Sequence, residues 1–114
     1  MCVPVLFEMF YVVASFNLNV ENFESLEDAE RHYVKQHVPL AKRLPGLRRY
    51  LIGHPIDFGI ATVVHHRAAL LAFDDRQVFT EAYRTEIGRE LRVDERRTIG
   101  EARIFYMDAE DVLL

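Results

Sequence analysis

Two segments of the chain are apolar at nearly every position, and not only at alternate ones. Residues 3–14 are rich in Val, Phe and Tyr, and residues 66–73 carry Ala, Leu and Phe on both alternating faces. Strands that are apolar on both faces are typical of a sheet that is covered on both sides. We therefore predict that these two segments are the central strands of one sheet.

A long amphipathic helix is predicted over residues 25–44. Ser25 and Asp28 form a capping-box pattern at its start, and acidic side chains precede basic ones along it, as the helix dipole favours. Pro39 removes one backbone hydrogen bond, so we expect a kink at residues 35–38. A Pro-Gly pair directly after the segment ends the helix.

The other elements are shorter. Residues 15–24 are polar and predict a loop, and a second helix follows the Asp74-Asp75 pair, with a break near Gly88. Two further strands are predicted at residues 47–53 and 101–107. The predicted order is strand, helix, strand, strand, helix, strand.

This βαββαβ order predicts an α+β fold of the ferredoxin-like kind, with a four-stranded antiparallel sheet and two helices on one face. The helices cover only that face, although the two central strands are apolar on both faces. A second copy of the same sheet is the simplest cover, because closed two-fold dimers are the commonest oligomers. We therefore expect a homodimer.

Composition narrows the class of protein. The chain has 114 residues, and we take residues 1–114 as a single domain. A formal net charge of -4 argues against a nucleic-acid partner, which would require a basic surface. The single cysteine, Cys2, excludes an internal disulfide and fits a reducing compartment. The apolar N-terminus lacks the pattern of a signal peptide and is too short to span a bilayer. These features predict a cytoplasmic protein with no membrane partner.

The central segment of the chain resembles a known family. It has an aromatic residue four positions before a histidine, then Pro-Leu, then a Pro-Gly-Leu turn that leads into a strand with a tyrosine. These positions are Tyr33, His37, Pro39-Leu40, Pro45-Gly46-Leu47 and Tyr50. The pattern resembles the signature of the EthD-like branch of the dimeric α/β barrel proteins, and the later ALLAFDD stretch is also similar.

The resemblance implies two ferredoxin-like protomers that pack sheet against sheet as a dimeric α/β barrel. It also implies a small-molecule pocket between each sheet and its own helices. Proteins of this kind include cofactor-free monooxygenases, lactone isomerases, and cyclases or dehydratases of aromatic and polyketide compounds. Others are accessory proteins in ether degradation. The resemblance therefore implies a fold and a kind of pocket more than one reaction.

His37 is the main candidate for catalysis. On an ideal helix it shares the core stripe with Leu26, Ala29, Tyr33, Leu40 and Leu44. A histidine among apolar side chains can act as a general acid or base. The alternative is a neutral structural histidine that donates a hydrogen bond to a carbonyl freed near Pro39.

Glu8 and several tyrosines are candidates for ligand binding. Glu8 interrupts an apolar strand, and burial in a pocket would raise its pKa and make it an acid-base group. The alternative is an ion pair with Arg67. Tyrosine hydroxyls can orient a ligand, or the rings can serve only as core packing. The tyrosines are Tyr33 and Tyr50, which flank the motif, and also Tyr11 and Tyr106.

Other kinds of site find little support. His32 and His37 are five positions apart, which is about 140° on an α-helix, so we expect them not to share a metal. His65 and His66 point to opposite faces of a strand. Cys2 and the serines have no evident activating partner, and no glycine-rich phosphate loop is present. We therefore expect neither metal nor cofactor.

Together these features predict a cofactor-independent enzyme of the oxygenase, isomerase, cyclase or dehydratase type. Its substrate is expected to be a small, hydrophobic, oxygenated molecule, with His37 as the acid-base group. The alternative is a non-catalytic accessory or ligand-binding protein of a degradation pathway. A third reading is a purely structural dimer whose pocket is filled by side chains.

Overall fold

A computed structural model describes residues 9–60 and 65–114 and confirms the predicted βαββαβ order. The strands form one antiparallel sheet in the order β2-β3-β1-β4, so the two segments that are apolar on both faces are its central strands. In chain order the elements are β1 (Met9–Leu18), η1 (Val20–Asn22), α1 (Leu26–His32), η2 (Tyr33–His37), α2 (Val38–Ala41), β2 (Arg49–Gly53), β3 (Arg67–Phe73), α3 (Arg76–Arg84), α4 (Glu86–Thr98) and β4 (Ile99–Ala109).

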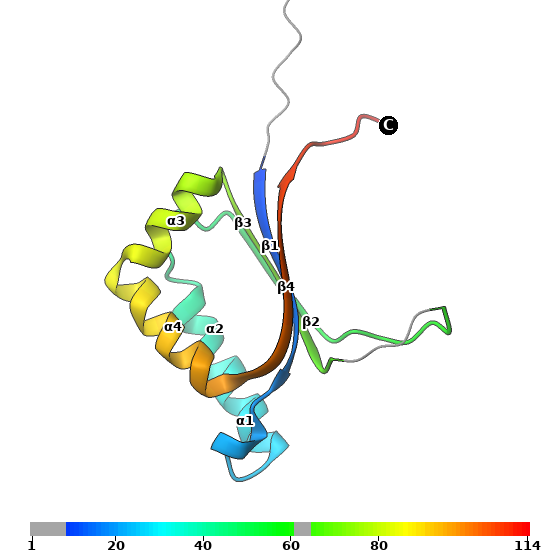
Figure 1. Ribbon diagram of the computed structural model, residues 1–114, viewed down its shortest axis with the longest axis vertical. Helices are drawn as coiled ribbons and strands as arrows, with labels where there is room; N and C mark the ends of the chain where they lie inside the picture. The colour runs from blue at the N-terminus through cyan, green and yellow to red at the C-terminus, as the bar shows by residue number, and fades with distance from the viewer. Residues whose placement is uncertain (1–8, 61–64) are drawn as a thin grey trace, which may run out of the picture.

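All helices of this part of the chain lie on one face of the sheet, and the other face carries none (Figure 1). The core lies between the two layers. It joins Phe10 and Val12 of β1 and Phe73 of β3 to Leu44 and Leu91 from the helical layer. None of the described helices is long and apolar enough to cross a bilayer.

Strand β1 is longer than predicted at its C-terminal end. Residues 15–18 were expected to begin a loop, but β1 continues to Leu18. Ser15 and Asn17 are polar, yet they alternate with Phe16 and Leu18, which are buried. A strand with one polar face was therefore mistaken for a loop, because alternation over four residues is a weak signal beside a fully apolar stretch.

The first helix begins as predicted and is interrupted where a kink was expected. The Ser25 hydroxyl accepts a hydrogen bond of 3.1 Å from the Asp28 backbone N–H. The interruption takes the form of a π-helical segment, Tyr33–His37, directly before the turn that contains Pro39. The helix ends at Ala41 and not at Leu44, because the following residues form turns.

The core stripe of this helix also differs from the prediction at its first position. Leu26 is the first helical residue and remains exposed, whereas Ala29, Tyr33 and Leu44 are buried as predicted. The prediction assumed one regular α-helix that is buried along one face from its first residue. Leu26 is that first residue, and it lies at the exposed end of the helix.

Gly46 allows the chain to turn from α2 into β2. Its φ is +81°, a left-handed conformation that an L side chain rarely adopts. A Cβ at this position would also collide with the side chain of Val78 in α3. The Pro-Gly pair is therefore required both for the turn and for the packing beneath it.

The second helical segment divides earlier than expected. The break falls at Thr85, whose hydroxyl accepts a hydrogen bond of 3.1 Å from the Gly88 backbone N–H and so caps α4. Gly88 lies inside α4, where a Cβ would come within 2.6 Å of the Ala82 carbonyl oxygen. The glycine thus permits close packing of α3 on α4. Strand β4 also begins earlier than predicted, at Ile99.

The helix-free face of the sheet exposes large apolar side chains. In the strand register Leu51 and Phe105 lie on the same face as Val13, and Met107 lies on the same face as Tyr11. The exposed fractions are 48% for Leu51, 55% for Phe105 and 41% for Met107. A contiguous apolar surface of this kind is typical of a protein–protein interface.

We expect this face to be covered by a second copy of the chain. Sedimentation at micromolar concentration should then give twice the chain mass of 13.3 kDa. Phe105→Lys should shift the equilibrium to the monomer, because it places a charge in the apolar contact. Glu86→Lys, an exposed change on the helical layer, is the matched control and should stay dimeric. A wild-type protein that sediments as a stable monomer would contradict the prediction.

Candidate functional site

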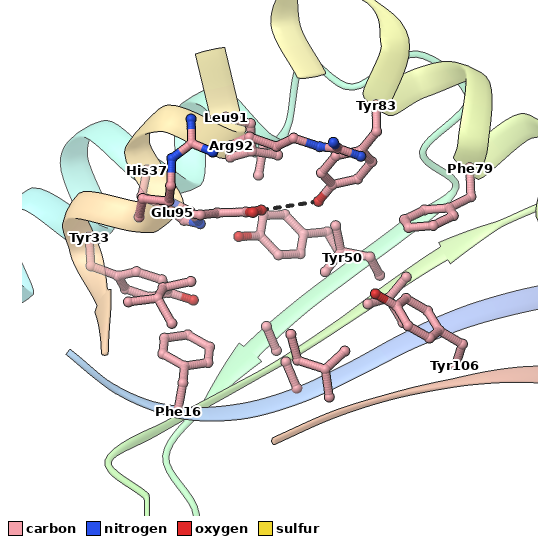
Figure 2. Close-up of a pocket in the computed structure, with 18 residues that line it drawn as sticks. Phe16, Tyr33, His37, Tyr50, Phe79, Tyr83, Leu91, Arg92, Glu95 and Tyr106 are labelled. Carbon is pink, nitrogen blue, oxygen red and sulfur yellow. Dashed lines mark hydrogen bonds between the residues drawn. The ribbon is translucent and has the colours of Figure 1, made fainter. Parts of the chain in front are cut away.

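A cavity of about 480 Å³ lies between the helical layer and the sheet (Figure 2). Its floor is apolar and includes Val12, Ala14 and Phe16 of β1 and Ala69 and Leu71 of β3. Ligand pockets for small molecules commonly have this size and an apolar lining with few polar groups. The aromatic residues that line it are Phe16, Tyr33, Tyr50, Phe79, Tyr83 and Tyr106.

His37 lines the cavity from the π-helical segment and is only 5% exposed. Its ring stacks on Tyr33, with the ring centroids 5.3 Å apart and an interplanar angle of 19°. His37 Nδ1 lies 2.8 Å from Asp94 Oδ2. Because an ionised carboxylate only accepts hydrogen bonds, Nδ1 carries the proton. The second ring nitrogen, Nε2, has no hydrogen bond to a described residue and holds the free lone pair.

The electrostatic environment favours the neutral form of His37. Burial lowers the pKa of His37, and the hydrogen bond to Asp94 offsets part of that effect. Burial alone would raise the pKa of Asp94, but the hydrogen bonds from His32 and His37 outweigh it and keep that pKa low. Asp94 is therefore ionised and His37 is an unprotonated base near neutral pH.

Asp94 also binds a second histidine. His32 Nε2 donates to Asp94 Oδ1 at 2.6 Å, and the Thr98 hydroxyl donates to Asp94 Oδ2 at 3.2 Å. The expectation that His32 and His37 point away from each other is therefore wrong. It assumed α-helical geometry, whereas a π turn hydrogen-bonds residues five apart and brings positions i and i+5 together.

The hydrogen-bond acceptor of His37 differs from the one expected if this histidine had a purely structural role. A backbone carbonyl freed near Pro39 was the expected acceptor, and the acceptor is instead the side chain of Asp94 in α4.

Within residues 9–60 and 65–114, no group of three potential ligands has the arrangement of a metal site. His65 and His66 lie just before β3 and not within a strand, and their side chains have different partners, since His65 bonds Ser15 while His66 bonds Glu30.

Glu95 is a second acid-base group in the cavity and was not found from the sequence. The Tyr83 hydroxyl donates to Glu95 Oε1 at 3.2 Å, as Figure 2 shows. Burial raises the pKa of Glu95 despite that hydrogen bond and the nearby Arg92. The sequence feature that could have identified Glu95 is its position four residues after Leu91, which is buried on the same face of α4.

The two tyrosines that flank the sequence motif also reach the cavity. Tyr33 is 1% exposed, and its hydroxyl makes no hydrogen bond of 3.5 Å or less to a described residue, although the neighbouring Tyr50 hydroxyl influences its pKa. Tyr50 comes from β2 and points into the same space (Figure 2). Burial raises the pKa of both hydroxyls, so both keep their protons and are available as donors.

An ion pair lies next to Tyr33, outside the residues that line the cavity. Arg67 lies 5.1 Å from the ring centroid of Tyr33 and is paired with Glu30. Burial would raise the pKa of Glu30, but its hydrogen bonds to Arg67 and His66 keep it below the ordinary value. Glu8, which was considered as the partner of Arg67, lies outside the described residues.

Tyr11 is not brought to the cavity. It pairs with Ala72 and Met107 in the sheet, and the cavity is lined by the alternate β1 residues Val12 and Ala14. Successive side chains of a strand point to opposite faces, so Tyr11 belongs to the helix-free face. Its possible contribution to ligand binding is therefore remote from His37.

Comparison with known proteins identifies the fold. An EthD-family protein from Bacillus halodurans superposes with a TM-score of 0.71 at 21% identity, over 91% of this chain and 99% of that one. A dimeric ferredoxin-like protein of unknown function from Thermobifida fusca gives a TM-score of 0.68 at 15% identity, over 96% and 100%. The chain therefore has the ferredoxin-like fold.

An enzyme shares this fold as well. SnoaB from Streptomyces nogalater, a cofactor-independent oxygenase, superposes with a TM-score of 0.63 at 13% identity, over 93% of this chain and 97% of that one. No family model matches the chain, and no curated protein is similar to it in sequence. At these identities the likenesses establish the architecture that the EthD-like resemblance implied.

The buried carboxyl group gives a test of the cavity electrostatics. Because the pKa of Glu95 is higher in the folded chain than in the unfolded chain, it stabilises the fold only at low pH, and this contribution is lost as the pH rises through the folded pKa. Glu95→Gln cannot ionise. Its thermal unfolding midpoint should equal that of the wild type below about pH 4 and exceed it increasingly as the pH rises toward the raised pKa of Glu95.

Glu90→Gln is the matched control, because Glu90 is exposed on the same helix. The control should track the wild type at every pH. A difference between Glu95→Gln and the wild type that does not change with pH would show that the carboxyl group titrates normally.

Proposed function

We propose that this protein binds a small, hydrophobic, oxygenated molecule in the cavity and acts on it without a cofactor, with His37 as the acid-base group. The observation that carries the proposal is the hydrogen bond between His37 Nδ1 and Asp94. It fixes the ring and its tautomer, and it leaves Nε2 as a base beside an aromatic cavity.

The lining of the cavity supports this choice of ligand. Its walls are aromatic and aliphatic, which suits a flat apolar body. The protonated hydroxyls of Tyr33 and Tyr50 are donors, and a carbonyl or phenol oxygen is the natural acceptor. The Tyr33 hydroxyl makes no hydrogen bond of 3.5 Å or less to a described residue, so a ligand oxygen that accepts from it, beside the neighbouring Tyr50 hydroxyl, would satisfy a buried donor.

The fold is compatible with such chemistry, since SnoaB is a cofactor-independent oxygenase. The proposal includes a homodimer in which the helix-free faces meet and each protomer keeps its own cavity. Cavity residues are Tyr33, Tyr50 and His37, while Tyr11 belongs to the helix-free face. A non-catalytic binding protein is the outcome if a ligand binds and is never converted.

The tautomer of His37 can be measured before any substrate is known. In ¹⁵N-labelled protein near neutral pH, Nδ1 should have the chemical shift of a protonated nitrogen and Nε2 that of a nitrogen with a free lone pair. Asp94→Asn should weaken this preference, because an amide can donate to Nδ1 and so favour the other tautomer. Asp111→Asn, an exposed change, is the control and should leave the spectrum of His37 unchanged.

Binding can be tested with simple aromatic ketones and phenols. Ligand-observed NMR with β-tetralone and α-naphthol should show binding to the wild type, and Ala69→Phe should abolish it by filling the floor of the cavity. His37→Phe should remain a folded dimer and lose about 10²–10⁴-fold in any conversion of a bound ligand. Absence of binding by the whole panel, or binding that Ala69→Phe leaves intact, would contradict the proposal.

A further inference from the structure

Two adjacent acidic residues of helix α4 lie in different surroundings. Asp94 lies against the Nδ1 side of His37, and the next residue, Glu95, lines the cavity itself. Successive residues of a helix are about 100° apart, so one helix can orient the base and also present a separate carboxyl group to the ligand. Figure 2 shows Glu95 and His37 on the helical wall above the apolar floor.

Glu95 is held by one oxygen only. The Tyr83 hydroxyl occupies Oε1 at 3.2 Å, and Oε2 has no hydrogen bond to the part of the chain that the structure describes. The other ionisable groups around it are Tyr50 of β2 and, on its own helix, Arg92, Asp94 and Arg96. Tyr83 therefore fixes the direction of the carboxyl group and leaves a second oxygen for a ligand.

We propose that Glu95 is the general acid that complements His37, and that the site enolises a hydrophobic carbonyl compound. This inference rests on the proposed function and specifies its chemistry. It assigns the substrate class as an aromatic or alicyclic ketone with a hydrogen on the carbon next to the carbonyl group. Glu95 and Tyr83 are then functional residues, in addition to those of the sequence motif.

The proton transfers balance without an oxidant or a reductant. His37 Nε2 takes a proton from the carbon next to the carbonyl group, and the electrons of that C–H bond form a C=C bond. The carbonyl oxygen accepts the displaced π electrons and takes the proton of Glu95. The Nε2 proton of the imidazolium exchanges with solvent while the enol is bound. The enol then returns its O–H proton to Glu95, while His37 gives the solvent-derived proton to the same carbon, or gives a proton to a conjugated one. The net result is hydrogen exchange or a shifted double bond.

The pKa shifts of His37 and Glu95 favour this proton transfer. Burial lowers the pKa of His37 and raises that of Glu95, so each group is shifted toward the neutral form that the reaction consumes. The step creates an imidazolium beside the Asp94 carboxylate and a carboxylate near Arg92. Each charge that forms therefore has an opposite charge already in place.

The test follows the exchange of the acidic α-protons of β-tetralone in D₂O by ¹H NMR, with wild-type protein against buffer. The wild type should accelerate exchange, Glu95→Gln should lose about 10²–10⁴-fold of that acceleration, and Glu90→Gln should retain it. The wild-type rate should fall at low pH as His37 is protonated and at high pH as Glu95 ionises. In Glu95→Gln the alkaline decline should disappear.

Saturation-transfer NMR on the same samples separates the two levels of the proposal. Bound β-tetralone with no catalysed exchange, or exchange that Glu95→Gln leaves unchanged, would overturn the role of Glu95 and leave the binding site standing. Failure of the wild type to bind any ketone or phenol of the panel would overturn the proposed function itself.

A second readout does not depend on turnover. In protein labelled with ¹³C at the glutamate carboxyl groups, the Glu95 resonance is identified by its loss in Glu95→Gln. It should titrate above the ordinary range of a glutamate carboxyl group, and a bound ketone should move the midpoint higher by excluding water. A Glu95 resonance that titrates in the ordinary range would overturn the assignment of an acid.

Discussion

The carboxylate of Asp94 joins the parts of this protein on which the site depends. It accepts hydrogen bonds from His32, which directly precedes the π-helical segment, from His37, which ends that segment, and from Thr98 at the end of its own helix. These contacts tie α4 to the first helix and set the direction of the His37 ring. A buried carboxylate is costly unless it is well hydrogen-bonded, and three donors satisfy this one. The packing of α4 against the first helix and the orientation of the base His37 therefore depend on the same carboxylate, that of Asp94.

The π-helical segment makes this convergence possible. A regular α-helix would direct His32 and His37 to different sides, and only one of them could reach Asp94. Pro39 follows the π turn, and its ring is incompatible with an uninterrupted α-helical ladder. The extra backbone length of the turn thus relieves the proline and aligns the two histidines. π-Helical turns often occur at functional sites, and here the turn places the imidazole in the cavity wall.

The cavity divides its tasks between the two layers. The sheet contributes small and aliphatic side chains such as Ala69, which leave space above the floor, and the hydroxyl of Tyr50, while the helices contribute His37 and Glu95. The low polarity of this environment lowers the pKa of His37 and raises that of Glu95, so each group is shifted toward its neutral form. On the opposite face the exposed Phe105 belongs to the surface for which a second protomer is predicted.

Local patterns in the sequence were sufficient for the order of elements, for the central strands and for the burial of His37, because these depend on periodicity and on short-range turn and capping signals. Ser25 identified the start of the first helix for the same reason, whereas the Pro-Gly pair predicted its end at Leu44 and the helix ends at Ala41. Only the tertiary structure showed which acidic residues accompany His37 at the cavity. Asp94 and Glu95 lie 57 and 58 positions after His37 in the chain, and no periodicity connects residues so far apart. Their contact requires α4 to pack against a π turn, which was predicted only as a kink. The physical reason is that side-chain pairing between helices depends on their packing and rotation, which local patterns do not specify.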